Sequence, residues 1–264
     1  MAAQDNLDAQ SQSIHKQRSY RVEAVVLRHS DWGEADRLLV LYTLEMGKVR
    51  ALAKGARRPR SRKAGHLEPF TRVTLQLARG RDLPIVSQAD TLEPYLRLRE
   101  ELLLSTYASY VVELLDRFTY EEGENRGLYR LLVDTLGRLS SGDAPEPAVR
   151  YYEIRLLDLL GFRPQLFHCV SCQAEIVQQD QFFSAELGGV LCPSCGGQDA
   201  RAWPVTMRGL KYLRHFQRSS FSEAARAPLT PGLNRELEAL MQHYLTYLLE
   251  RGLNTPAFLR RIKE

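Results

Sequence analysis

The chain has 264 residues, 44% of them hydrophobic, which is enough apolar material for one large core or two modest ones. Residues 1–95 hold 16 Lys and Arg against 11 Asp and Glu, a net charge of +5, whereas residues 96–264 hold 20 against 21, a net charge of −1. This asymmetry favours a polyanionic partner for the N-terminal part, although sign alone does not separate DNA, RNA and anionic lipid. Since no run of 18 apolar residues and no apolar signal segment is present, we expect no membrane span, no secretion and a cytoplasmic location.

The first 19 residues are polar and rich in Gln and Ser, and we expect them to form a disordered extension outside the fold. From Tyr20 to residue 96, short apolar segments alternate with polar positions, which is typical of β-strands. A turn is expected at residues 29–33. Five short strands in about 75 residues suit a small closed barrel, either of the OB type or of the SH3-like type. The expected strands lie near residues 22–26, 38–42, 48–54, 73–77 and 83–87.

After Leu98 the apolar period changes from two to about 3.6, which indicates helices. We therefore predict an α+β protein with a barrel domain at residues 20–96 and a helical domain at residues 97–264. Proline at a helix start, threonine caps and a glycine after a helix end support the boundaries of the helices. The predicted helices cover residues 102–118, 128–139 and 145–161, with two more that begin after Thr206 and Thr230. The sequence patterns do not decide whether the last segment, residues 254–264, has an ordered structure.

The most specific chemical pattern is a pair of Cys-x2-Cys motifs within residues 165–200. Cys169 and Cys172 are separated by 19 residues from Cys192 and Cys195, and these are all four cysteines of the chain. The spacing matches a four-cysteine zinc site, since each tight turn brings two thiolates to two corners of a tetrahedron. Between the pairs, residues 181–183 and 188–191 indicate a hairpin, as in a zinc ribbon.

Four thiolates fill a tetrahedral shell and leave no position for an activated water molecule. We therefore expect a structural zinc ion rather than a catalytic one. A pair of disulfides is disfavoured because the cytosol keeps thiols reduced. His168 precedes Cys169 in the sequence, but a fifth ligand is not required.

A basic run covers residues 48–63, where eight of 16 positions are Lys or Arg and none is acidic. Such a run on an exposed strand and loop neutralises phosphates and releases counterions, which makes binding steeply dependent on salt. If strand alternation continues through Gly55, it places Lys48, Arg50, Lys54 and Arg58 on one face. Few aromatic residues lie nearby, so we expect binding to depend little on base sequence. The candidate DNA-binding residues are Lys54 and Arg58, assisted by Arg37, Arg57, Arg60, Arg62 and Lys63.

Several short motifs in this order are similar to those of the bacterial recombination mediator family RecO. The resemblance covers about residues 20–250, which makes it more specific than any single motif. The motifs are Gly33-Glu34-Ala35-Asp36-Arg37-Leu38, Gly47-Lys48, the segment from Ala53 to Arg58, Leu67-Glu68-Pro69-Phe70, and Leu160-Gly161-Phe162 with Pro164.

The resemblance implies an OB-fold followed by a helical domain that carries a zinc module. It also implies a bacterial, nucleoid-associated protein that binds single- and double-stranded DNA and anneals complementary strands. The implied protein partners are RecR and the single-stranded-DNA-binding protein, which is recognised by its acidic, Phe-ended tail. The partnership with RecR is implied to help RecA displace the single-stranded-DNA-binding protein from DNA. Such a tail needs an apolar notch beside a cation in the helical domain. Candidate cations are Arg126, Arg150, Arg155, Lys211 and Arg214.

Two other functional classes stay open at this point. One is a zinc-dependent nucleic-acid enzyme with a metal-bound water, or a magnesium nuclease that uses Glu34 and Asp36. The other is an RNA-binding protein of transcription or translation. The chain has no HExxH, no Walker-type lysine loop and no GxSxG motif, so we predict a protein that is not an enzyme.

Overall fold

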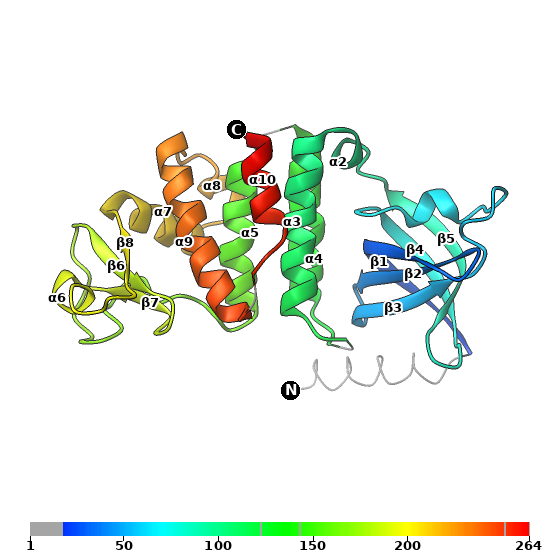
Figure 1. The fold of residues 1–264 in the computed structure, drawn as a ribbon, viewed down its shortest axis with the longest axis horizontal. Coiled ribbons are helices and arrows are strands. Elements are labelled where there is room, and N and C mark those ends of the chain that lie inside the picture. Colours follow the sequence, from blue (N-terminus) through cyan, green and yellow to red (C-terminus); the bar gives the residue numbers. More distant parts are fainter. Residues whose placement is uncertain (1–17, 122, 143, 251, 264) are drawn as a thin grey trace. The chain divides into compact units, whose positions relative to one another are not determined.

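The computed structural model describes residues 18–121, 123–142, 144–250 and 252–263. Most of the predicted N-terminal extension, residues 1–17, lies outside the described residues. Two compact units are present: residues 18–108 with 119–140, and residues 109–118 with 141–263 (Figure 1). The domain bounds at residues 20–96 and 97–264 stay a prediction about which segments fold independently.

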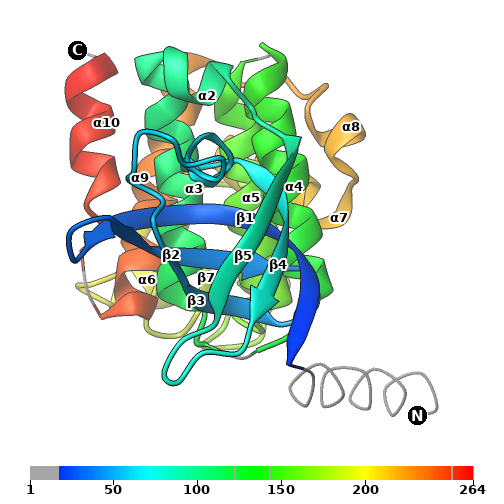
Figure 2. The same cartoon turned by 90° about the vertical axis from the view of Figure 1, so that its right-hand side faces the viewer.

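Five strands of the first unit form a closed barrel in the order β1-β2-β3-β5-β4 (Figure 2). β3 and β5 pair in parallel, and the other neighbours pair in antiparallel. A short 3-10 helix, η1 (Ala64–Leu67), lies between β3 and β4. This five-stranded barrel has the topology of an OB-fold, which confirms the predicted fold and decides against the SH3-like alternative. The strands are β1 (Ser19–Trp32), β2 (Asp36–Thr43), β3 (Gly47–Ala53), β4 (Arg72–Ala78) and β5 (Ile85–Glu93).

The barrel core follows from the period of two in its strands. Val22, Ala24 and Val26 of β1 are at most 1% exposed, as alternation along a half-buried strand requires. The turn predicted at residues 29–33 lies later in the chain, at residues 33–35, because β1 continues to Trp32 and pairs with β2 as far as Asp36. The end of β1 extends past the core, so its side chains are polar or exposed on both faces and resemble a loop in the sequence.

The first unit also contains α2 (Arg97–Glu100), the beginning of α3 (Leu102–Phe118), and α4 (Arg126–Ser141) up to Ser140. Leu128, Leu132 and Leu136 form the buried stripe of α4. Tyr129 of α4 donates to Oε1 of Glu23 at 2.8 Å, which fixes the helix to the barrel through a partly buried hydrogen bond.

The second unit is a group of helices with a ribbon-like module inserted after α5. The predicted helices 102–118, 128–139 and 145–161 and the two capped by threonine are confirmed. The Thr206 side chain accepts from the backbone N–H of Gly209, and the Thr230 side chain accepts from that of Leu233. The helices are the end of α3, α5 (Pro145–Leu159), α7 (Met207–Arg218), α8 (Phe221–Ala224), α9 (Pro231–Leu249) and α10 (Thr255–Lys263). Within the described ranges, no helix is both long enough and apolar enough to span a membrane.

A buried polar group lies among these helices. Arg150 and Glu153 of α5 are at most 2% exposed and form an ion pair of 3.1 Å. Tyr110 donates to Glu153 at 2.7 Å. Burial raises the pKa of Glu153 to about 7, although Arg150 and the Tyr110 hydrogen bond favour the charged form.

The inserted module is a small antiparallel sheet with one helical turn. Its strands are β6 (Gln181–Ser184), β7 (Gly189–Leu191) and β8 (Trp203–Val205), in the order β7-β6-β8, and its helix is α6 (Pro193–Gly196). The predicted hairpin is confirmed as β6 and β7. The third strand was not predicted, because Pro204 interrupts a segment of three residues and proline argues against a strand.

Candidate nucleic-acid interface and metal centre

The loop that follows β3 carries most of the basic run. Gly55 has a φ of +66°, which favours glycine and ends the strand at Ala53. The backbone N–H of Gly55 donates to Oδ1 of Asp36 at 2.7 Å, and that of Arg57 donates to the carbonyl of Ala35 at 2.9 Å. The loop is therefore fixed against the turn between β1 and β2.

The expected alternation through Gly55 is wrong. It holds from Lys48 to Ala53, where Val49 and Ala51 point into the core, and it stops where the left-handed Gly55 reverses the chain. Arg50 pairs instead with Glu121, with 2.6 Å between Nε and Oε1. Lys48 and Arg50 thus do not continue one strand face with Lys54 and Arg58.

The seven predicted DNA-binding residues divide into two groups. Four of them are exposed on the loop, and none of these four forms an ion pair within the part of the chain that the structure describes. They are Lys54, Arg58, Arg60 and Arg62. Because no carboxylate among the described residues pairs with them, their charges are available to an external anion.

The other three predicted cations hold the loop in place. Arg37 pairs with Glu68 at 2.9 Å, Arg57 pairs with Asp31 at 3.1 Å, and Lys63 donates to the carbonyl oxygen of Val86 at 2.8 Å. Partial burial lowers the pKa of Lys63, and the nearby Asp36 opposes this effect. We infer that these side chains position the loop more than they offer free charge.

The nearby aromatic residues differ in exposure. Tyr42 is completely buried and Phe70 is 6% exposed, so both belong to the core. Trp32 is 52% exposed at the end of β1. Trp32 lies between Asp31 and Gly33, which both contact Arg57, so this strand end lies beside the basic loop. The Trp32 indole can stack on an unpaired base.

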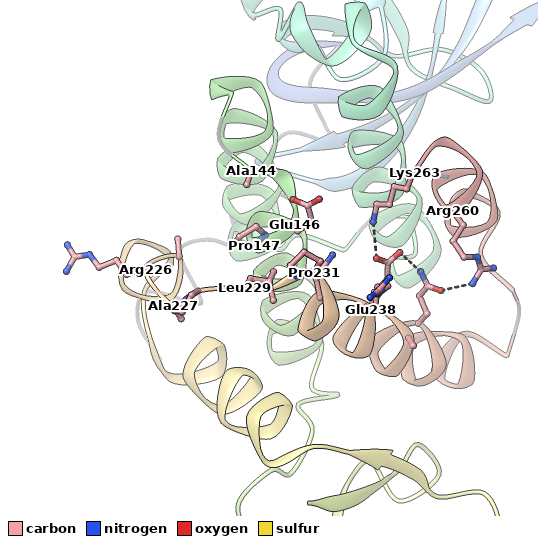
Figure 3. A pocket seen from close by; sticks show the side chains of 16 residues that line it. Ala144, Glu146, Pro147, Arg226, Ala227, Leu229, Pro231, Glu238, Arg260 and Lys263 are labelled. Atoms are coloured by element: carbon pink, nitrogen blue, oxygen red, sulfur yellow. Dashed lines mark hydrogen bonds and ion pairs between the residues drawn. The ribbon is translucent and has the colours of Figure 1, made fainter.

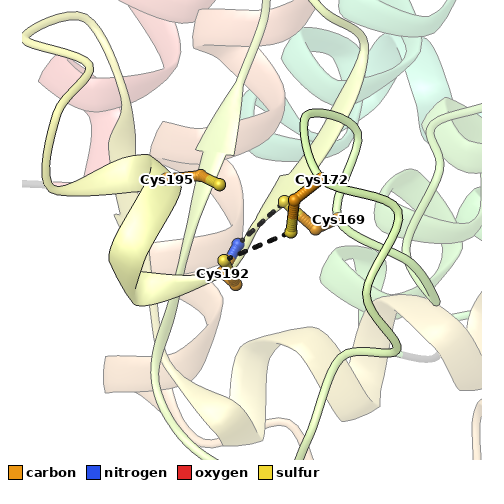
Figure 4. Close-up of side chains that lie close together, drawn as sticks. All are labelled: Cys169, Cys172, Cys192 and Cys195. Atoms are coloured by element: carbon orange, nitrogen blue, oxygen red, sulfur yellow. Dashed lines mark hydrogen bonds between the residues drawn. The ribbon is translucent and has the colours of Figure 1, made fainter.

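The four cysteines converge in the module (Figure 4). All four sulfur atoms lie within 4.8 Å of one another, and those of Cys172 and Cys192 are 3.8 Å apart. A tetrahedral zinc ion with bonds of about 2.3 Å requires sulfur atoms about 3.8 Å apart, so the donor set fits such an ion. Among the described residues, this is the one group found with three or more candidate metal ligands.

Two local turns produce this convergence. In the first, the backbone N–H of Cys169 donates to the carbonyl of Ala174 at 2.8 Å, and Gln173 has a φ of +62°. In the second, Cys192 precedes the short helix α6. Gly196 closes this helix against Phe182, where a Cβ atom would lie 2.4 Å from the ring.

Two of the four thiols differ in their pKa values: Ser171 lowers the pKa of the Cys195 thiol, but the neighbouring cysteines outweigh it and raise this pKa, whereas the pKa of Cys169 shifts the other way. Burial raises the pKa of the Cys169 thiol, but backbone hydrogen bonds from Cys172, Cys192 and Ser171 outweigh burial and lower the pKa to about 6. None of the four cysteines forms a disulfide. The residues can therefore hold a metal ion through four sulfur ligands, while His168 does not belong to the group.

A separate cavity of about 880 Å³ lies in the second unit (Figure 3). Apolar side chains and prolines such as Pro147, Leu229 and Pro231 form part of its wall. Lys263 pairs there with Glu238 at 2.9 Å, and Arg260 donates to Gln242 at 3.4 Å. The cations around this cavity are Arg226, Arg235, Arg260 and Lys263.

The cations proposed from sequence for the helical part do not line this cavity. Arg150 is buried against Glu153, Arg126 pairs with Glu124 at 3.0 Å, and Arg155 pairs with Asp158 at 3.2 Å, whereas Lys211 and Arg214 belong to α7. The sequence did not point to the cations at the cavity. Two of them, Arg260 and Lys263, belong to α10, a segment for which no helix was predicted. Pro228 and Pro231 could have indicated this cavity, because proline fixes the backbone angle φ and so gives the cavity wall a rigid backbone.

An OB-fold barrel with an exposed basic loop and a four-cysteine module defines a nucleic-acid-binding class of protein. The family model described as Recombination protein O N terminal matches residues 18–95, and that described as Recombination protein O C terminal matches residues 99–257. The chain therefore belongs to the RecO family of recombination and DNA repair proteins.

Individual relatives agree with this assignment. DNA repair protein RecO of Roseiflexus sp. (strain RS-1) is 41% identical over 249 residues, covering 94% of this chain and 88% of the relative. DNA repair protein RecO of Pelotomaculum thermopropionicum is 38% identical over 242 residues, covering 92% and 94%. DNA repair protein RecO of Dehalococcoides mccartyi (strain CBDB1) is 34% identical over 236 residues, covering 89% and 93%.

Proposed function

We propose that this protein is a recombination mediator that binds single- and double-stranded DNA and anneals complementary strands. The observation that carries the proposal is the loop with Lys54, Arg58, Arg60 and Arg62, whose exposed cations have no ion-pair partners within the described residues. The phosphates of one strand neutralise these charges, and the same charges screen the repulsion of a second strand.

The remaining basic residues position this loop. Arg37, Arg57 and Lys63 hold it through contacts with Glu68, Asp31 and Val86, which lowers the conformational entropy that binding would otherwise cost. Trp32 adds sequence-tolerant stacking on unpaired bases. No covalent chemistry enters this mechanism, so we propose that the protein does not act as an enzyme.

We further propose that the cysteine site holds zinc in a structural role. Cys169, Cys172, Cys192 and Cys195 would provide all four ligands of a tetrahedral ion. The ion would cross-link the two turns of the module and so stabilise the fold. Support comes from the convergence and spacing of the four sulfur atoms.

The partner proposals rest on family membership and on the cavity near α10. With RecR, the protein would help to load RecA onto DNA coated by the single-stranded-DNA-binding protein, in the bacterial cytoplasm. The acidic, Phe-ended tail of that protein suits a cavity with an apolar wall and the cations Arg226, Arg235, Arg260 and Lys263. We also propose that residues 20–96 and 97–264 are the domains of this mediator, with residues 1–19 as an extension.

Annealing of complementary oligonucleotides, bare or coated with the single-stranded-DNA-binding protein, tests this function across a salt series. Salt-sensitive annealing without nucleotide or catalytic metal would support it. Failure to bind or anneal DNA at low salt contradicts the proposal. A strong preference for RNA in competition would favour an RNA partner, and chelator-sensitive cleavage by the folded protein would favour a zinc enzyme.

A further inference from the structure

Helix α7 in the second unit has an entirely basic solvent face. Its sequence contains no Asp or Glu. Arg208, Lys211 and Arg218 are exposed, and Arg214 is half-buried between them. Spacings of three, three and four residues keep these four side chains on one side of a helix. The opposite side consists of buried residues, including Leu210, Leu213 and Phe216.

The charges of this α7 stripe, defined as Arg208, Lys211, Arg214 and Arg218, are not balanced by ion pairs. Within the described ranges none of the four lies within 4.0 Å of a carboxylate oxygen. Lys211 donates to Gln178, a neutral side chain, at 3.3 Å. Two acidic groups at the start of α7, Asp180 and Glu236, accept hydrogen bonds from the backbone N–H groups of Met207 and Thr206, respectively.

Neighbouring contacts hold part of the stripe in a defined position. Arg214 donates to the carbonyl of Leu166 at 2.8 Å, and its guanidinium lies 4.9 Å from the Phe167 ring centre. The Arg218 guanidinium lies 3.7 Å from the same ring centre. Burial and the charge of Arg218 lower the pKa of Arg214, whereas Glu175 opposes them. Two like charges beside one ring repel each other, which an external anion would relieve.

Helix stability does not explain the stripe. Cations near the C-terminal end of a helix are favourable, which accounts for Arg218. Arg208 lies in the first turn, where a positive charge opposes the helix dipole. The eleven residues from Arg208 to Arg218 span ten helical rises, about 15 Å, comparable to about four phosphate spacings along one strand of B-form DNA.

We propose that the α7 stripe is a second nucleic-acid surface, which binds the phosphate backbone of one DNA strand while the barrel loop binds another. This inference rests on the proposed DNA-binding function and assigns a separate site to it. An acidic, Phe-ended peptide fits the stripe poorly, because such a peptide needs an apolar notch, and the exposed residues of this face are cations. Two strand sites on one protein allow it to hold both annealing partners at once.

Strand capture by the full chain tests this inference. Protein saturated with an immobilised oligonucleotide is offered a labelled, non-complementary second strand, so that capture does not depend on base pairing. The test variant is Arg208→Gln with Lys211→Gln and Arg218→Gln, which leaves the half-buried Arg214 in place. The matched control removes the same charge at three exposed arginines elsewhere, Arg21→Gln, Arg130→Gln and Arg261→Gln.

We expect the α7 variant to capture the second strand weakly, with a salt slope flatter by about two units, while the control resembles the parent. An Arg208→Lys, Arg218→Lys variant should retain capture and show that the charge matters. Parent-like capture by the α7 variant overturns the inference, as does loss of binding only to an acidic peptide. If neutralising the barrel loop leaves DNA binding unchanged but the α7 variant abolishes it, the proposed barrel site fails, whereas the assignment of the α7 stripe as a nucleic-acid surface is supported.

Discussion

Neutralising the exposed cations of the barrel loop provides the most direct test of DNA binding. The change replaces Lys54, Arg58, Arg60 and Arg62 with Gln. These side chains are exposed, without ion pairs in the described part of the chain, so the substitutions remove charge without disturbing the core. The backbone hydrogen bond from Gly55 to Asp36 at 2.7 Å stays, and with it the position of the loop.

The expected magnitude follows from counterion release. Each phosphate neutralised on a single strand contributes about 0.7 to the slope of log affinity against log salt. Four lost contacts should therefore flatten the slope by about three units. The parent-to-variant affinity ratio should then be about 50-fold larger at about 50 mM salt than at about 200 mM salt.

Fluorescence anisotropy of a labelled single strand measures both slopes in the same salt series. A control with the exposed Arg21, Arg81, Arg130 and Arg261 replaced by Gln removes the same charge elsewhere and should keep the parental slope. Parallel lines for parent and loop variant would refute the reasoning, because phosphate contacts at these residues cannot leave the slope unchanged. An equal effect in the control would show that net charge, rather than the loop, is responsible.

Three further outcomes are expected. Trp32→Ala should weaken single-stranded DNA binding by about 1–3 kcal/mol while leaving duplex binding and the salt slope nearly unchanged, if the indole stacks on a base; equal loss for both DNA forms in anisotropy titrations would contradict this. Cys172→Ser should lower the bound zinc measured by mass spectrometry and reduce the melting temperature, whereas the neighbouring Ser194→Ala should do neither; a stable, metal-free variant with parental annealing would exclude a structural role. Burial raises the pKa of Glu153 from 4.5 to about 7, so the stabilising contribution of the protonated group is full below about pH 4.5 and is lost as the pH rises through about 7. Glu153→Gln should therefore flatten the decline of the unfolding free energy between these pH values. Identical denaturant profiles against pH for parent and variant would be inconsistent with this pKa shift.

Local patterns in the sequence were sufficient for the main elements. The period-two segments predicted the barrel strands, and apolar spacing with Thr206 and Thr230 as caps predicted the helices, because these signals arise between residues close in the chain. The two Cys-x2-Cys motifs predicted a single metal site for the same reason, since each motif makes its own turn. Family motifs, rather than periodicity, distinguished the OB-fold from an SH3-like barrel.

Contacts between distant segments decided what the basic residues do. Eight cations in one run look equivalent in sequence, yet Glu121 pairs with Arg50, Asp31 pairs with Arg57, and Val86 accepts from Lys63. Strand pairing with β2 likewise extended β1 through a segment that resembles a turn. Similarly, Phe167, which lies close to Cys169 in the sequence, contacts the guanidinium groups of Arg214 and Arg218 in α7. The sequence by itself determined which side chains are charged, but only the tertiary structure decided which charges are matched internally, because ion pairing depends on distances of a few ångströms between residues far apart in the chain.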